Sequence, residues 1–186
     1  GASLVAVRCG ASPLLARLPF PRMSDAPHRN VIRVIEAGRG LGVDVVPRHF
    51  AQGAKTAQDA ADAIGVGVGQ IVKSLIFGVA SEADELELVL AYVSGKNQLN
   101  EKLLAAAAGA AKCKRVDADA VRMSTGYPIG GVPPFGHANP LRVFIDPDLL
   151  AFDEVWAAAG TWNDVFAIEP HELVRASGGT VTNLRK

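Results

Sequence analysis

The chain has little of what metal sites, disulfide frameworks and membrane spans require. Of its 186 residues only two are cysteines, Cys9 and Cys113, and they lie far apart, outside any Cys-x-x-Cys or Cys/His pattern. We therefore expect no metal, no cofactor and no disulfide scaffold, and a reducing cytoplasm is the default compartment. No helix-like apolar stretch approaches the roughly 20 residues that a membrane span needs, so no membrane association is expected.

Net charge is also absent. The 19 Lys and Arg residues balance the 19 Asp and Glu residues, which gives a formal net charge of zero. This balance argues against wide, sequence-independent coating of nucleic acid. A modest basic cluster at Lys112, Lys114 and Arg115 is either an ordinary solvated face or a local contact for phosphates. The four histidines show no i, i+4 metal spacing and no H-E-x-x-H motif.

What the chain does have is enough apolar sequence for one full core. Hydrophobic residues make up 49% of the chain and charged residues 20%, which is typical of one globular domain. We expect residues 1–28 to be an N-terminal extension outside the fold, and residues 29–186 to form a single domain. Residues 1–22 precede Met23-Ser-Asp, which resembles an initiator, and Arg8 and Arg17 interrupt their apolar run, which disfavours a secretion signal.

The most informative segment is Gly126-Tyr-Pro-Ile-Gly-Gly-Val-Pro-Pro-Phe-Gly-His137, which holds three prolines and four glycines. Proline lacks an N–H and fixes φ, while glycine reaches positive φ freely, so neither a helix nor a central strand is expected. Such a loop is either a rigid connector or a device that brings backbone N–H groups close to a ligand. His137, which closes it, either lines that site or merely ends the loop.

A lysine lies in the middle of an apolar strand pattern, Gln70-Ile-Val-Lys-Ser-Leu-Ile-Phe77. Alternation places Ile71, Lys73 and Leu75 on one face and apolar residues on the other face as well, so the strand should be central. The Lys73 ammonium either extends from the strand end to water or is held in a mostly apolar pocket to bind an anionic or ester group.

Helix caps and alternating segments predict an α+β fold rather than a doubly wound one. Asn30, Thr56 with Asp59, Asn100 and Asp117 are the expected caps, and Gly65, Gly109 and Gly126 the expected helix ends. The predicted helices are 30–39, 57–64, 101–108, 118–125 and 170–176. The predicted strands are 43–46, 70–77, 86–93, 141–145, a piece near 155, and 165–168, with 70–77 and 86–93 forming an antiparallel pair.

Motifs for nucleotide binding and serine hydrolysis are incomplete. Gly65-Val-Gly-Val-Gly69 precedes Lys73-Ser74, but Val72 stands where a Walker A loop needs glycine, and Gln70 replaces the third glycine of G-x-G-x-x-G. A flexible turn between helix and strand explains these glycines better. No G-x-S-x-G elbow is present, although a Ser-His-Asp triad does not require neighbouring positions in the chain.

Four segments in order resemble the YbaK/prolyl-tRNA synthetase-associated domain. They are Thr56-Ala-Gln-Asp-Ala-Ala61, the Lys73 strand, the Gly126–His137 loop and Val155-Trp-Ala-Ala-Ala-Gly160. The resemblance covers roughly residues 29–184. It implies a curved, mixed, largely antiparallel and barrel-like sheet flanked by helices. It also implies a free-standing aminoacyl-tRNA deacylase that removes a wrong small amino acid from tRNA, often tRNA(Pro), with the acceptor end as partner and prolyl-tRNA synthetase as a further one.

The resemblance also implies the site. Lys73 matches the functional lysine of the family, and Gly130 and Gly131 match its glycine loop; Ser74 and Phe50 would line the pocket, together with Gly126, Val132, Pro134 and His137. Water would attack the ester while loop N–H groups bind the developing oxyanion. Some members have serine where this chain has Pro133, a departure that argues against transferring a specificity for cysteine to this chain. Alanine, serine, threonine and other small residues stay equally open. The alternatives are a non-catalytic module that binds aminoacyl-tRNA or a synthetase, and an esterase for a small metabolite.

Overall fold

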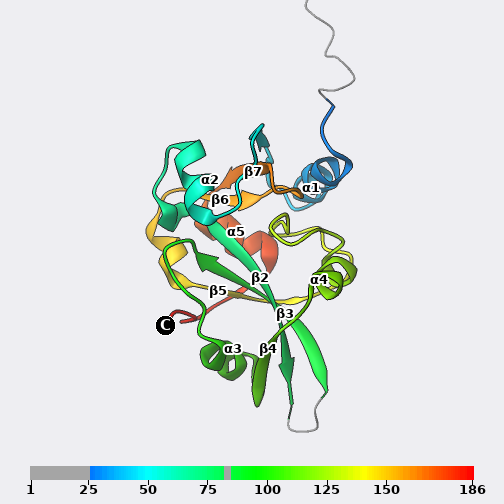
Figure 1. The fold of residues 1–186 in the computed structure, drawn as a ribbon, viewed down its shortest axis with the longest axis vertical. Coiled ribbons are helices and arrows are strands. Elements are labelled where there is room, and N and C mark those ends of the chain that lie inside the picture. The colour runs from blue at the N-terminus through cyan, green and yellow to red at the C-terminus, as the bar shows by residue number, and fades with distance from the viewer. Residues whose placement is uncertain (1–25, 82–84) are drawn as a thin grey trace, which may run out of the picture.

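The computed structural model describes residues 26–81 and 85–186. The prediction of an N-terminal extension therefore lies mostly outside the described residues. Within them the chain forms an α+β fold of two β-sheets with flanking helices, as predicted (Figure 1). No helix in these two described ranges has the length and apolarity needed to cross a bilayer.

The larger sheet has the strand order β4-β2-β3-β5-β8. Its long central hairpin is β2 (Val72–Ala80) with β3 (Leu86–Ser94), antiparallel with Lys73 opposite Val93, which confirms the predicted pair. The other strands are β4 (Lys112–Arg115), antiparallel to β2, β5 (Arg142–Ile145), parallel to β3, and β8 (Thr180–Val181), parallel to β5.

The smaller sheet has the order β1-β7-β6 and is entirely antiparallel. Its strands are β1 (Arg48–His49), β6 (Val155–Ala158) and β7 (Asp164–Ile168). An isolated parallel bridge between Ile71 and Trp156 joins it to the start of β2. The two sheets thus curve around a shared core without closing into one continuous barrel.

Five α-helices flank the sheets, and most begin and end where the sequence predicts. Those within residues 26–81 and 85–186 are α1 (Arg29–Gly40), α2 (Ala57–Ile64), α3 (Glu101–Ala108), α4 (Ala118–Thr125) and α5 (Pro170–Ser177), with short 3₁₀ turns η2 (Val68–Gln70) and η3 (Pro147–Ala151). The capping box of Thr56 and Asp59 and the caps Asn100 and Asp117 are all formed. Gly126 ends α4 with φ 81°, a left-handed conformation that glycine adopts without strain.

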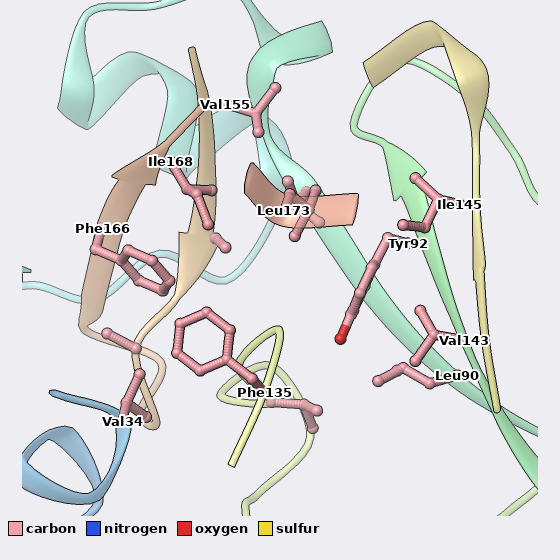
Figure 2. Packing of buried hydrophobic residues seen from close by; sticks show 14 of the residues in the cluster. Val34, Leu90, Tyr92, Phe135, Val143, Ile145, Val155, Phe166, Ile168 and Leu173 are labelled. Carbon is pink, nitrogen blue, oxygen red and sulfur yellow. The ribbon is translucent and has the colours of Figure 1, made fainter. Parts of the chain in front are cut away.

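The main core lies between the two sheets (Figure 2). Phe135 extends from the Gly126–His137 loop into this core, where its ring centroid lies 5.8 Å from that of Phe166 on β7. Tyr92 on β3 approaches from the opposite side and is fully buried. The loop is therefore part of the core packing along its second half, which fixes its path. A second apolar cluster covers the other face of β2 and β3 beneath α3.

Two local predictions are wrong, and one strand was not predicted. Helix α1 is capped by His28, whose Nδ1 accepts from the Asn30 N–H at 3.1 Å, while the Asn30 side chain donates to the Gly160 carbonyl at 3.1 Å. Residues 43–46 form no strand, although Val43 and Val45 are buried, and the strand there is β1. The basic cluster of residues 112–115 is strand β4, formed because the β2 edge offers it backbone partners.

Candidate active site

The Lys73 strand and the glycine loop, which lie far apart in the sequence, meet at two adjoining cavities. The first, of about 490 Å³, we call the Arg115 cavity, and the second, of about 370 Å³, the Trp156 cavity. Both are lined by the same five residues: Lys73, Ser74 and Leu75 from β2, and Ile129 and Val132 from the loop. The two segments singled out by the sequence therefore form the partition between the cavities.

A gap in strand pairing creates this space. Strand β4 pairs only with Phe77–Ala80 of β2, and the single bridge from Ile71 joins Trp156. Between these points, the 72–76 segment of β2 pairs with β3 along one edge and with no described strand along the other. The uncovered edge leaves backbone groups without a strand partner, and Lys73, Ser74 and Leu75 of this segment line the two cavities together with Ile129 and Val132 of the loop.

Lys73 is half-buried and its ammonium is held in place. Its Nζ donates a hydrogen bond to the backbone carbonyl of Asn97. The Asn97 side chain in turn donates to Asp146 at 2.7 Å and to Asp148 at 3.0 Å. Asp146 is fully buried and also accepts from the Ser94 N–H at 3.2 Å. The turn that holds Lys73 is thus fixed by a buried carboxylate.

Burial also lowers the pKa of Lys73 below its ordinary 10.5, and the negative charge of Asp146 opposes this decrease. The desolvation of the ammonium is the larger cause. An amine that is partly withdrawn from water and aimed along a cavity wall is suited to bind an anionic or strongly polar group of a ligand.

Two buried side-chain nitrogen or oxygen atoms in the described part of the chain have no hydrogen-bond partner, Ser74 Oγ and Trp156 Nε1. Both residues line the Trp156 cavity. A buried polar group left without a partner costs about 1–3 kcal/mol, which makes its position worth explaining. Polar groups of a ligand bound in this cavity could therefore form hydrogen bonds with these two atoms.

Side-chain donors fix the carbonyl groups of the glycine loop. Five of them bind successive parts of the loop: Arg33 binds Gly126 (3.3 Å), Trp162 binds Ile129, His137 binds Pro133 (2.7 Å), Tyr92 binds Pro134 (2.8 Å) and Tyr127 binds Gly136 (3.1 Å). Burial lowers the pKa of His137, and its bond to the Pro133 carbonyl opposes that shift. These bonds fix the path of the loop on both sides of Gly130–Val132.

Some N–H groups of the glycine loop donate hydrogen bonds within the protein and others do not. The Gly131 N–H closes a turn by donating to the Pro128 carbonyl at 2.9 Å, with Gly130 at φ 79°. Among the hydrogen bonds of the described residues, none is donated by the N–H of Gly130 or Val132. Both residues line the Trp156 cavity together with Lys73. Proline at 133 and 134 provides no donor there.

Gly131 has a second, steric role. A Cβ at this position would lie 3.0 Å from backbone atoms of Gly160 and Thr161. Only glycine therefore allows the loop to approach the β6–β7 turn so closely. The sequence predicts Gly131 as an N–H donor; in the structure that N–H closes the turn, and the free neighbouring donors are those of Gly130 and Val132.

The remaining predicted site residues lie elsewhere. Pro134 and His137 line a separate cavity of about 460 Å³, Gly126 ends α4, and the Phe50 N–H donates to the Asn163 carbonyl at 2.7 Å. None of these four lines the Arg115 or Trp156 cavity. Their assignment as substrate-binding residues stays a prediction, while Lys73, Ser74, Gly130 and Val132 are brought together.

Sequence reasoning missed the residues that hold this site in place. Asp146, Asn97 and Trp162 belong to none of the sequence motifs described above, because their contacts are with segments distant in the chain. Asp164 accepts from His49 at 2.9 Å within the β6–β7 region, but no group of three or more His, Cys, Asp or Glu residues suited to a metal ion occurs in residues 26–81 and 85–186.

Comparison with known proteins agrees with this geometry. The aminoacyl-tRNA editing domain family matches residues 51–176. YwhH of Bacillus subtilis strain 168, itself uncharacterised, is 34% identical over 124 residues, which is 67% of this chain and 76% of YwhH. The proline–tRNA ligase of Desulforamulus reducens is 32% identical over 99 residues, 53% of this chain but only 16% of the ligase.

A solved structure is similar over almost its whole length. It is described as a candidate trans-editing enzyme for prolyl-tRNA synthetase, and it superposes with a TM-score of 0.78 at 37% identity, covering 87% of this chain and 99% of that one. The family match spans the Lys73 strand, the glycine loop and the β6–β7 hairpin. The chain belongs to the aminoacyl-tRNA editing domain family, and it is an ester hydrolase that deacylates aminoacyl-tRNA.

Proposed function

We propose that this chain removes a small mischarged amino acid, of the alanine, serine, threonine or cysteine class, from tRNA(Pro). The observation that carries the proposal is the meeting of Lys73 with the free N–H groups of Gly130 and Val132 between two cavities. The choice of tRNA rests on the similarity to the proline–tRNA ligase and to the trans-editing structure. Prolyl-tRNA synthetase is accordingly the proposed partner.

The reaction is the attack of water on the ester that joins the amino acid to the terminal ribose. Negative charge develops on the carbonyl oxygen as the carbon becomes tetrahedral. Donors from Gly130 and Val132 would bind that oxygen, and each well-placed donor of this kind contributes about 3 kcal/mol to the transition state. Collapse of the intermediate breaks the bond to the ribose oxygen, which leaves protonated as the free hydroxyl, and releases the amino acid.

Lys73 is assigned an electrostatic role. Its ammonium, held by the Asn97 carbonyl beside the two cavities, would stabilise negative charge near the ester or bind the terminal nucleotide. We do not assign it as the base, because the Lys73 side chain is only half-buried and an amine must be strongly desolvated to be neutral at pH 7. The water would be ordered by the substrate and by polar groups of the cavity wall, among them Ser74 Oγ.

The Trp156 cavity is the place proposed for the amino acid. Its walls include Ala54, Ala57, Ala60, Ile71 and Val165, small or apolar residues that leave about 370 Å³. Selection in such a pocket is steric, and one methylene group changes binding by only about 1–3 kcal/mol. Alanine, serine, threonine and cysteine should therefore react at graded rates.

The Arg115 cavity is the place proposed for the phosphates of the acceptor end. Lys73, Arg115 and Lys186 line it against a single acidic residue, Glu101. This local excess of positive charge would attract RNA phosphates even though the net charge of the whole chain is zero. Binding through a few phosphates should weaken steeply as salt rises.

The test is deacylation of tRNA(Pro) charged in turn with alanine, serine, threonine, cysteine and proline. The matched control is tRNA(Ala) charged with alanine, which carries the same ester on a different tRNA. Rapid loss of one or more small amino acids, with prolyl-tRNA(Pro) and alanyl-tRNA(Ala) spared, is the expected result. Equal hydrolysis of both alanyl-tRNAs would overturn the tRNA(Pro) assignment, and no hydrolysis of any species would overturn the substrate class.

A further inference from the structure

An exposed tryptophan stands at the edge of the proposed site. Trp162 is 60% exposed, although tryptophan is usually well buried, and the chain has only one other, Trp156. Trp162 lines the Trp156 cavity together with Lys73 and Gly130. Ile129, which is 50% exposed, lies next to it, so the two form an apolar rim beside the catalytic groups.

The indole is held at one edge. Its Nε1 donates to the Ile129 carbonyl, and a Cβ added to Gly130 would lie 3.2 Å from its Cδ1. The ring therefore rests edge-on against the glycine turn. The side chain is ordered by this contact, yet much of its surface stays open to solvent, where it contributes little to the stability of the core.

The turn that carries Trp162 is also well fixed. The Ala159 N–H donates to the Asp164 carbonyl at 2.8 Å, and the Asn163 N–H donates to Thr161 Oγ1 at 3.1 Å. The Asn30 side chain binds Gly160 from α1. A rigid support beneath an exposed aromatic face is what a stacking platform needs, because little side-chain freedom is lost when a flat ligand binds.

Space for a flat group exists beside the indole. Trp162 also lines a cavity of about 380 Å³, which we call the His49 cavity, together with His28, Asn30, His49 and Pro128. Trp162 and Thr161 are shared between this cavity and the Trp156 cavity. A nucleoside whose 3′ ester enters the Trp156 cavity can thus place its base beside Trp162.

We propose that Trp162 is the stacking platform for the adenine base of the terminal nucleotide of the aminoacyl-tRNA. The assignment rests on the proposed function, since it takes the bound ester to lie at Lys73 and Gly130. Stacking of one base on an aromatic side chain corresponds to a roughly 5- to 150-fold change in affinity. Every base has such a face, so Trp162 adds affinity for the nucleotide without reading the amino acid.

Binding of adenosine 5′-monophosphate and of ribose 5-phosphate tests the platform without any deacylation. In a Trp156→Phe variant the only tryptophan fluorescence is that of Trp162. We expect adenosine 5′-monophosphate to quench it and ribose 5-phosphate to leave it unchanged at the same concentration. Equal responses to the two ligands, or none to either, would overturn the assignment.

Two substitutions separate stacking from support of the loop. Trp162→Phe keeps an aromatic face but loses the N–H to Ile129, whereas Trp162→Leu keeps apolar bulk and loses both. We expect Trp162→Leu to raise KM for mischarged tRNA roughly 5- to 150-fold, and Trp162→Phe to stay much closer to wild type. Equal losses in both variants, carried by kcat, would mean that Trp162 only anchors the loop and would overturn the proposal.

The two proposals fail in different ways. If wild type hydrolyses mischarged tRNA and Trp162→Leu has an unchanged KM, the platform is wrong while the function stands. If wild type hydrolyses none of the charged tRNAs but adenosine 5′-monophosphate still quenches Trp162 selectively, the base site stands and the substrate assignment falls.

Discussion

The two halves of β2 have the same alternating apolar pattern, but they differ in how many neighbouring strands they pair with. Residues Phe77–Ala80 pair with β3 on one edge and β4 on the other, and Val79 is only 2% exposed. The 72–76 segment pairs with no strand of the described residues on its second edge, and Lys73 and Ser74 there are only partly buried. The comparison shows that four residues of extra pairing separate a structural strand edge from one that can receive a substrate.

The largest difference in activity is expected between two lysine substitutions, one in the 72–76 segment of β2 and one on β4, which pairs with residues 77–80. Lys73→Ala removes the ammonium beside the ester, and we expect kcat/KM for mischarged tRNA to fall roughly 100- to 1,000-fold, the loss typical of a missing electrostatic stabiliser. Lys114→Ala is the control, because Lys114 is exposed on β4 opposite Gly78 of the paired half. Circular dichroism should show both variants folded; an active Lys73→Ala would remove Lys73 from the site.

A smaller effect is expected across the cavity, in the loop that faces the open half. Gly130→Ala places a side chain at φ 79° and 3.2 Å from Trp162, so the turn must shift and misalign the Gly130 and Val132 donors. We expect kcat to fall roughly 10- to 100-fold. Gly109→Ala is matched, with φ 69° and open space around the new Cβ, and should lose similar stability, about 1–2 kcal/mol, at full activity. Equal kcat values in the two variants would contradict the oxyanion role.

The smallest effect is a pH dependence of stability that comes from the open half alone. The pKa of Lys73 is lowered in the folded state, so between that pKa and 10.5 the unfolded chain binds more protons. The free energy of unfolding of wild type should therefore gain from Lys73 as pH rises through this window, a gain that Lys73→Met lacks. Denaturant unfolding of both proteins at several pH values up to 10.5 measures the difference; a difference independent of pH would mean that the lysine is not desolvated.

Local sequence signals predicted a large part of the fold. Thr56 with Asp59, Asn100 and Asp117 cap the helices they were expected to cap, because a side-chain oxygen needs only the next turn of backbone as its partner. The β2–β3 pair followed from two apolar runs joined by a short polar turn. The wrong cap and the unpredicted strand were both decided by distant partners: Asn30 binds Gly160 instead of capping α1, and β4 forms only against the edge of β2.

The segments that form the candidate site can be recognised before folding is considered, since a lysine in an apolar strand and a loop of glycines and prolines are chemically unusual in any fold. Which of their hydrogen-bonding groups are available depends on contacts in the folded chain. The Gly131 N–H donates to the Pro128 carbonyl, so among these three neighbours the N–H groups without a partner in the described part of the chain are those of Gly130 and Val132. Asp146 and Asn97, far from Lys73 in sequence, fix its ammonium. Hydrogen bonds between distant segments and gaps in strand pairing arise from the packing of the whole chain, and no local pattern encodes them.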